Sequence, residues 1–399
     1  MKKRIITAAA CLLTLLQASA ESITDILSRQ GFEDIRVNIV EDVVYASVEP
    51  TAYRGTFRGA TIALEELGDF FPEYNRVELV VTEYQLPQVA VHAQRDAASW
   101  QVSVDYKMSP ILKQLKDQPT GNSSAWRFDF TAYPMVSLDN HRFDKLYEYT
   151  VSIAPTIEAT LWPGNRITLM PVFPVASNVW QSKPEGYIHI GVAAIQQEVC
   201  LCNQLKAQVA GGLFMGNLMG VDAKLIWRAG KSLTFGLKAA VLGEAYVDAD
   251  KYHFEKLDKV SVLGKASYYH ALTQLEAELT GGRFVYGDYG ARLDITRHCG
   301  EFAIGVFGIL TGGESNAGFH FAIPFGGKRQ MRKGGVRLKL PEYYDMEYNM
   351  ESYYEYADQK MGRQVETRPD VNHSAHYWQA AYVEQFLRKS LAQKRERKR

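Results

Sequence analysis

Polar and apolar residues alternate almost without error from Tyr147 to Leu161. One parity carries apolar side chains such as Ile153, whereas the other carries mainly polar ones, including Glu148 and Glu158. A period of two places successive side chains on opposite faces of a β-strand. The run is about three times as long as the ~5-residue strands usual in soluble domains. A strand of this length, apolar on one face only, is typical of a transmembrane β-barrel.

Further alternating segments follow one another from Trp126 to Phe325 and predict an antiparallel barrel of about twelve strands. Tight turns are expected at Pro163-Gly164, Cys200–Cys202, Ala229-Gly230, His270-Ala271 and Cys299-Gly300. Longer connections are expected at Ser137–Tyr147, Ala176–Glu185, Glu244–Lys259 and Gly281–Tyr289, with Met215–Leu218 as a short link on the same side. Alternating short and long connections indicate two rims that face different compartments, with both chain ends on the tight-turn, periplasmic side. Alternating strands also build soluble sandwiches, but the strand length and the rim asymmetry favour the membrane.

The first twenty residues have the composition of a secretory signal. Lys2, Lys3 and Arg4 are followed by the apolar segment Ile5–Leu16 and by an Ala18-Ser19-Ala20 cleavage site. Beyond this signal no uncharged apolar run is long enough for a spanning helix. The formal net charge of zero gives no whole-chain attraction to nucleic acid. A bacterial outer-membrane location is therefore expected.

The mature chain is expected to be mainly β, with a small periplasmic α+β module before the barrel and a periplasmic extension after it. The expected ranges are 1–20 for the signal peptide, 21–95 for the module, 96–124 for a strand and linker, 125–326 for the barrel and 327–399 for the extension. In the module, Ser22 and Gly31 should bound a helix, and a second helix is expected at Arg58–Leu67. A polar connector is expected from Lys113 to Ser124. Helical spacing of Ala380, Val383, Phe386, Leu387 and Leu391 predicts a terminal amphipathic helix.

The polar side chains at alternate positions of the barrel strands should point into the lumen. The candidate lumen-facing residues are Arg127, Asp129, Glu148, Glu158, Lys206, Asp222, Lys224, Lys238, Arg292 and Asp294. Mixed charges in the lumen can make a salt-bridged wall, a polar conduit, or both. Side chains fill the interior of a barrel of ~8 strands, whereas a barrel of ~16 strands has an open channel, and twelve strands lie between these cases. Glu148 and Glu158 lie ten positions, ~33 Å, apart along one strand, too far to act on one glycosidic bond.

No sequence motif predicts chemistry. G-x-S-x-G, H-E-x-x-H, P-loop and C-x-x-C patterns are absent, so no catalytic, cofactor or metal site is predicted and the protein is expected not to be an enzyme. His189, His270, His298 and His320 are interpreted as structural, because none adjoins a nucleophile motif. Disulfide pairing among Cys200, Cys202 and Cys299 is left open, and small residues in turns are the favoured interpretation.

Several segments carry a family pattern. A GDYG hairpin lies within Arg283–Ala291, and Gly318–Phe325 reads G-F-H-F-A-I-P-F. Near the N-terminus, Gly31–Val37, Glu49–Arg54 and Leu86-Pro87 look like the periplasmic module of the same family. The chain thereby resembles the YjbH family of exopolysaccharide-associated outer-membrane proteins. Family members are often much longer, and this chain has room for one barrel only.

The resemblance implies a role in exporting or assembling an exopolysaccharide or capsule, as a conduit or a scaffold. The implied partners are outer-membrane lipid, a polysaccharide, and export proteins of the periplasm or outer membrane, without nucleic acid or cofactors. Two other classes stay open. One is a structural or assembly component of an outer-membrane secretion machine, and the other is an outer-membrane hydrolase.

Overall fold

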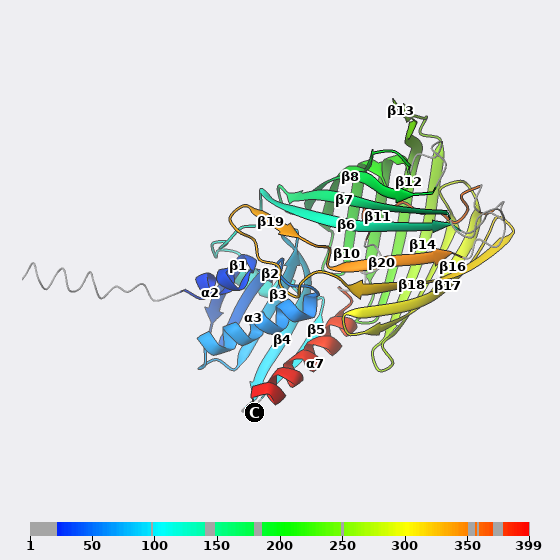
Figure 1. Cartoon of the computed structure of the whole chain (residues 1–399). Coiled ribbons are helices and arrows are strands. Elements are labelled where there is room, and N and C mark those ends of the chain that lie inside the picture. The colour runs from blue at the N-terminus through cyan, green and yellow to red at the C-terminus, as the bar shows by residue number, and fades with distance from the viewer. Residues whose placement is uncertain are drawn as a thin grey trace, which may run out of the picture.

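A computed structural model describes residues 22–96, 99–139, 148–178, 186–248, 251–349, 356, 359–369 and 378–398. The export signal expected over residues 1–20 lies outside these residues, as does Tyr147. The chain is mainly β, and its strands form two sheets of very different size (Figure 1). Within the described part of the chain, no helix is both long enough and apolar enough to cross a membrane.

The smaller sheet forms an α+β module that contains the N-terminal part of the described chain. Its order is β1-β2-β3-β4-β5, and only β2 and β3 run parallel. The strands are β1 (Glu33–Val40), β2 (Val43–Glu49), β3 (Arg76–Glu83), β4 (Leu86–Asp96) and β5 (Ser99–Asp105). Helices α2 (Ile23–Gln30) and α3 (Thr56–Phe70) share one hydrophobic core with this sheet, whereas α4 (Ser109–Leu115) packs in a separate cluster with β3 and β4.

Local sequence explains where α2 begins and ends. The Ser22 hydroxyl accepts a hydrogen bond from the Asp25 amide, and the Asp25 carboxylate accepts one from the Ser22 amide. This capping box satisfies donors that a helix start otherwise leaves free. Gly31 ends the helix at a φ of 94°, which favours glycine. The predicted helix is therefore confirmed, and the one expected at Arg58–Leu67 is confirmed as part of α3.

Helix α4 differs from the sequence prediction, which places a polar connector from Lys113 onward. The helix continues to Leu115. Pro110 occupies its first turn, where the missing amide hydrogen is not needed. Ile111 and Leu115 are buried beside Ala90 of the module sheet, and this burial stabilises a helix that the polar composition alone does not indicate.

The C-terminal helix α7 (Ala380–Lys398) completes the hydrophobic core of the module and corresponds to the predicted terminal helix. Its buried side chains include Tyr382, Val383, Phe386 and Leu387. It also covers the edge of β5. The Val104 amide donates to Glu384 Oε2 at 3.1 Å, and Arg388 Nη2 donates to the Val102 carbonyl at 2.9 Å. These contacts occupy edge groups that otherwise invite pairing with another chain.

The larger sheet contains fifteen strands. The seven strands β6 to β12 and the five strands β14 to β18 follow one another as antiparallel neighbours. They are β6 (Arg127–Asp139), β7 (Glu148–Thr160), β8 (Asn165–Ser177), β9 (His189–Cys200), β10 (Leu205–Phe214), β11 (Leu218–Arg228), β12 (Leu233–Asp248), β14 (Lys259–His270), β15 (Leu275–Arg283), β16 (Tyr289–Cys299), β17 (Phe302–Thr311) and β18 (Glu314–Pro324). The short β13 (Lys251–Phe254) pairs only with β12. Figure 1 shows that the sheet curls strongly around one of its faces.

Two strands from the range expected as the C-terminal extension join this sheet. β19 (Val336–Lys339) runs parallel to β6, and β20 (Tyr343–Asn349) runs antiparallel to β18. They stand at the two ends of the strand order, and the curl brings β20 beside β6 (Figure 1). Among the described residues no ladder of backbone hydrogen bonds joins β20 to β6.

Burial along β7 follows the alternation seen in the sequence. Tyr149, Val151 and Ile153 are 36–50% exposed, whereas Thr150 and Ser152 are at most 6% exposed. Other strands expose apolar side chains in the same way, among them Leu169, Val209, Leu237, Val262, Leu293, Val306 and Phe319. We call the face that carries these buried polar side chains the inner face, and the opposite face the outer face. This distribution is the reverse of that in a water-soluble sheet.

Close backbone approach requires glycine where β10 and β11 meet on the inner face. Gly212 of β10 and Gly220 of β11 are register partners, with φ values of 138° and 142°. A Cβ on Gly220 would lie 2.1 Å from the Val241 carbonyl oxygen of β12.

We therefore expect Gly220→Ala to lower the free energy of unfolding by about 2 kcal/mol or more, because strain and a backbone clash coincide. Gly308→Ala in β17 is the matched control, since a Cβ there meets nothing within 4 Å. It should change stability by less than about 0.5 kcal/mol. Urea unfolding in detergent micelles measures both, and equal effects would contradict the explanation.

Candidate functional site

Most of the charged residues that the sequence alternation predicts to face inward form three groups on the inner face. The first contains Arg127, Asp129 and Glu158, the second Asp222, Lys224 and Lys238, and the third Arg292 and Asp294. Lys206 instead bonds to Gln88 of the module and to Glu198 of β9. Glu148 is buried at the opposite end of β7 from Glu158, so the structure does not bring these two carboxylates together.

Asp129 is the centre of the first group. Its carboxylate accepts hydrogen bonds from Arg337 and forms ion pairs with Arg332 Nη1 at 2.9 Å and with Lys339 Nζ at 3.6 Å. Three cations from the segment that contains β19 thus surround one carboxylate of β6. Because few of these atoms reach water, the ion pairs fix the position of β19 against β6.

The same group connects the large sheet to the module. Glu33 of β1 accepts from Arg127 at 2.7 Å and from Arg332 at 2.8 Å. Glu158 pairs with Arg166 of β8. Charged residues from both sheets therefore form one continuous network at their junction.

The second and third groups lie deeper on the inner face. Fully buried Asp222 lies 3.6 Å from Lys224 Nζ and 3.9 Å from Lys238 Nζ. Arg292 Nη2 contacts Asp294 and also Glu347 of β20, each at 2.7 Å. Because β17 and β18 separate β16 from β20 in the sheet, the Arg292–Glu347 pair crosses the concave side.

Residues 359–369 run along the inner face, and we call them the inner strap. Met361 packs with side chains of β14 and β17, including Leu263 and Ile309. Val365 packs with residues of β10, β11 and β12, including Phe214. The strap therefore contacts widely separated strands from within the curl, and its apolar side chains occupy part of the interior.

Hydrogen bonds hold the inner strap at several points. Lys238 Nζ donates to the Val365 carbonyl at 2.5 Å. The Gly362 amide donates to Asp288 Oδ2 at 2.8 Å, in the β15–β16 connection. The Met215 amide donates to the Glu366 carbonyl at 3.1 Å, in the β10–β11 connection. These contacts reach from the rim distant from the module to the middle of the sheet.

The module covers the tight-turn rim. Each of the five tight turns contacts the module or α7. The contacts are Gly164 to Tyr84, Cys200 to Pro87, Lys231 to Ala381, Ala271 to Gln385 and Gly300 to Tyr382. Glu301, beside the last turn, also pairs with Arg54 and Arg58 near the start of α3. The module thus caps one end of the curled sheet.

A cavity of about 190 Å³ lies between the module and the inner face. Its walls combine acidic, basic and aromatic side chains, including Glu49, Glu83, Arg368, Tyr343 and Trp378. Burial and a shared hydrogen bond with Asp34 raise the pKa of Glu49 well above its ordinary value. Burial also raises the pKa of Glu83, which accepts a 2.8 Å hydrogen bond from the Trp378 indole. Mixed polar and aromatic groups of this kind suit a polyhydroxylated ligand.

Sequence parity alone does not find the partners supplied by the C-terminal segment. Arg332, Glu347 and the inner strap lie outside the alternating strands, whereas Arg337 lies in the alternating segment Val336–Leu340, which predicts one more strand and corresponds to β19. The basic density from Lys328 to Lys339 is a further signal in the sequence. Within the described residues Cys200, Cys202 and Cys299 are free thiols, and no cluster of three or more acidic, His or Cys residues is arranged to hold a metal.

A separate ion triad on the module consists of Arg76, Glu78 and His92, and Asp105 lies beside it. His92 Nδ1 contacts Glu78, and its Nε2 lies 3.1 Å from Asp105. Arg76 also pairs with Glu78 at 2.8 Å. The hydrogen bond to Glu78 and that to Asp105 raise the pKa of His92. Burial opposes ionisation of Glu78, but hydrogen bonds from His92 and Arg76 outweigh it and lower the pKa of Glu78.

These shifts predict a pH-dependent contribution to stability. The His92 contribution is complete below its ordinary pKa of about 6.5 and is lost as pH rises through its raised pKa. The Glu78 contribution is lost as pH falls through its lowered pKa. We expect His92→Gln to lower the free energy of unfolding by about 1 kcal/mol near pH 6, with the difference shrinking at alkaline pH. His253→Gln, at an exposed position on β13, is the control, and a pH-independent His92→Gln effect would contradict the triad.

One comparison with known proteins identifies a family. Residues 13–322, more than three quarters of the chain, match the family model YjbH, described as "Exopolysaccharide biosynthesis protein YbjH". No curated protein and no solved structure matches the chain.

Proposed function

Because the chain belongs to the YjbH family of exopolysaccharide biosynthesis proteins, we propose that it acts in the outer membrane to export or assemble an exopolysaccharide. In this proposal the large sheet is a transmembrane β-barrel, and the tight-turn rim with the module faces the periplasm. The chain's own part is to bind and guide the glycan. It carries out no chemistry.

The apolar outer face is the observation that carries the proposal. Exposed apolar side chains occur on β7, β8, β10, β12, β14, β16, β17 and β18, while polar and charged groups occupy the inner face. A soluble monomer rarely exposes apolar patches larger than a few hundred Å². Lipid is the partner that such a continuous apolar surface around a curled sheet fits best.

Aromatic residues near the tight-turn rim support the same orientation. Trp162, Trp227, Phe235 and Tyr268 are each at least 38% exposed. All four lie within a few residues of a tight turn, and Trp227 stacks on Phe235 with 5.6 Å between ring centroids. Aromatic side chains gather at the level of lipid headgroups because each combines an apolar body with polar or polarisable edges.

The filled interior favours a closed conduit, with a sealed scaffold as the second candidate. The inner strap and the module occupy the concave side and one rim, so a glycan needs the strap to move before it can pass. A scaffold needs no such movement.

Two contacts of His320 converge on one of its ring nitrogens. Thr296 Oγ1 and Asp294 Oδ1 approach the same ring nitrogen, Nε2, at 3.3 and 3.7 Å. A relay needs the nucleophile and the orienting carboxylate on different nitrogens of the histidine. Elsewhere the Ser267 hydroxyl donates a hydrogen bond to Glu276, which also contacts His298. This hydroxyl therefore bonds to a carboxylate.

A deletion strain tests the proposed function. We expect loss of the gene to lower the amount of polysaccharide at the cell surface, and the full chain to restore it and to fractionate with the outer membrane. An inner-face variant, Asp222→Ala, should restore less than Asp117→Ala, which changes an exposed carboxylate of the module. Unchanged surface polysaccharide in the deletion strain would overturn the proposal.

A further inference from the structure

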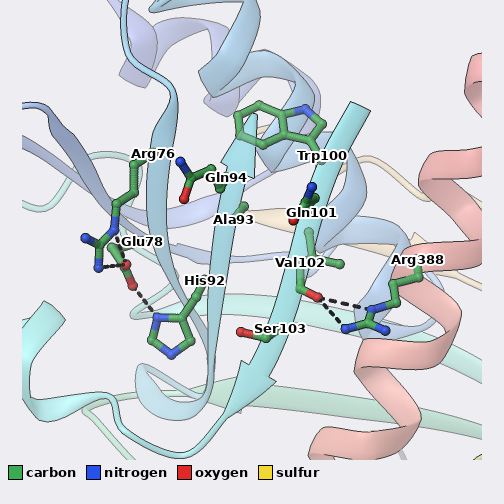
Figure 2. Close-up of a pocket in the computed structure, with 10 residues that line it drawn as sticks. All are labelled: Arg76, Glu78, His92, Ala93, Gln94, Trp100, Gln101, Val102, Ser103 and Arg388. Atoms are coloured by element: carbon green, nitrogen blue, oxygen red, sulfur yellow. Dashed lines mark hydrogen bonds and ion pairs between the residues drawn. The ribbon is translucent and has the colours of Figure 1, made fainter. Parts of the chain in front are cut away.

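The module sheet has an uncovered polar face beyond α4. A groove of about 690 Å³ lies there, lined by side chains of β3, β4 and β5 and by Arg388 of α7 (Figure 2). This volume falls within the range of about 300–1,000 Å³ usual for ligand sites. Helix α4 covers only the part of this face around Val80 and Ala90. The groove is separate from the charged inner face and from the junction cavity.

Strand register arranges the polar side chains of the groove in two rows. Arg76, Gln94 and Gln101 are successive register partners across β3, β4 and β5. Glu78, His92 and Ser103 form the second row in the same way. Neighbouring strands lie about 4.8 Å apart and the rows about 6.6 Å apart, so the six side chains make a regular polar ribbon.

One part of the groove is held rigid and another part is free to bind. Arg76, Glu78 and His92 are fixed by the ion triad, as the dashed contacts in Figure 2 show. The side chains of Gln94 and Gln101 have no hydrogen-bond partner among the described residues, and both are exposed. Each amide offers two donors and one acceptor oxygen. The ion triad fixes the base of the groove, and the two amides leave hydrogen-bonding groups that a ligand can use.

We propose that this groove binds a short stretch of a glycan chain through the paired amides of Gln94 and Gln101 and the Arg76 guanidinium. Neighbouring hydroxyl groups of a sugar present donors and acceptors that match planar amides and guanidinium groups. Arg388 lies at one side of the groove in Figure 2 and adds a second cation, whereas the Trp100 ring at its end packs against the module core.

The composition of the groove argues for a glycan over other ligands. Arg76 pairs with Glu78, His92 with Glu78 and Asp105, and Arg388 with Glu384. The groove therefore has no strong net charge that would select a nucleic acid or a phosphorylated chain. Its two rows contain no apolar side chain, so an amphipathic helix has nowhere to bury its apolar face. The edge of β5 is already occupied by α7, which excludes an added peptide strand at that edge.

The choice of ligand class rests on the proposed function, whereas the site itself rests on the groove. Periplasmic glycan has two sources, the secreted polysaccharide and peptidoglycan. The full chain in detergent micelles is titrated calorimetrically with oligosaccharides from partial hydrolysis of the secreted polysaccharide, and separately with soluble peptidoglycan strands. The preferred probe identifies the source.

We expect Gln94→Ala/Gln101→Ala to bind the preferred probe about tenfold more weakly than the unmodified chain, because two hydrogen-bonding groups are lost. Gln204→Ala, at an exposed position on the β9–β10 turn, should leave affinity unchanged. Both positions in the double variant are exposed, so the fold should be retained, and matching melting temperatures check this. Binding of neither probe, or equal affinity of the double variant and Gln204→Ala, would overturn the groove as a glycan site. Surface polysaccharide in the deletion strain tests the export role independently.

Discussion

Replacing the inner strap, residues 359–369, by a Gly-Ser linker of equal length is expected to turn a silent protein into a conducting one in planar lipid bilayers. The strap places Met361 and Val365 among apolar side chains of the inner face, and Lys238 donates to its backbone. In the proposed barrel the interior can then fill with water, because the curled sheet has more strands than the ~8-stranded barrel that side chains fill. The full chain should show no resolvable steps, whereas the variant should show discrete ones.

The linker keeps α7 joined to the rest of the chain, so the module core is retained. The same substitution in β13, an exposed strand outside the interior, is the control and should remain silent. Heat-modifiable gel mobility checks that each protein is folded. A folded strap variant that stays silent would contradict the closed conduit and favour the sealed scaffold.

Asp129→Ala should produce the largest loss of stability among single substitutions on the inner face. It leaves Arg332, Arg337 and Lys339 close together without their shared carboxylate. Removing one partner of a buried ion pair typically costs about 3–5 kcal/mol. We expect a loss of this size in urea unfolding, together with faster hydrogen exchange in β19, which these ion pairs hold against β6.

Asp117→Ala is the matched control, because Asp117 is exposed and forms no ion pair among the described residues. It should change the free energy of unfolding by less than about 0.5 kcal/mol. If Asp129→Ala is equally mild, or if β19 exchanges no faster, the ion-paired junction is not what fixes β19.

The strands were accessible to sequence reasoning because alternation is a local property. In β7 the polar and apolar parities alone separate the buried face from the exposed one. The capping box at Ser22 and Asp25 and the glycine at Gly31 likewise act within a few residues, and they locate α2. The family segments near Gly31 and Gly318 point to the family that the chain belongs to.

The contacts that fill the interior were not accessible in this way. Asp129 and Arg337 are more than two hundred positions apart, and Lys238 meets the backbone of Val365. Nothing within either partner's own segment encodes such a pairing, because it depends on how the whole sheet curls. For the same reason, the burial of α7 in the module core follows only when the two ends of the chain are seen together.

The orientation of β7 in lipid bilayers tests the central proposal most directly. Cys200, Cys202 and Cys299 are first replaced by Ser, and single nitroxide labels are then placed along the strand. The positions are Tyr149, Thr150, Val151, Ser152, Ile153 and Ala154. Collision with oxygen, which concentrates in lipid, should peak at Tyr149, Val151 and Ile153 with a period of two. If a water-soluble nickel chelate reaches those three positions as readily as it reaches Thr150, Ser152 and Ala154, the outer surface does not face lipid.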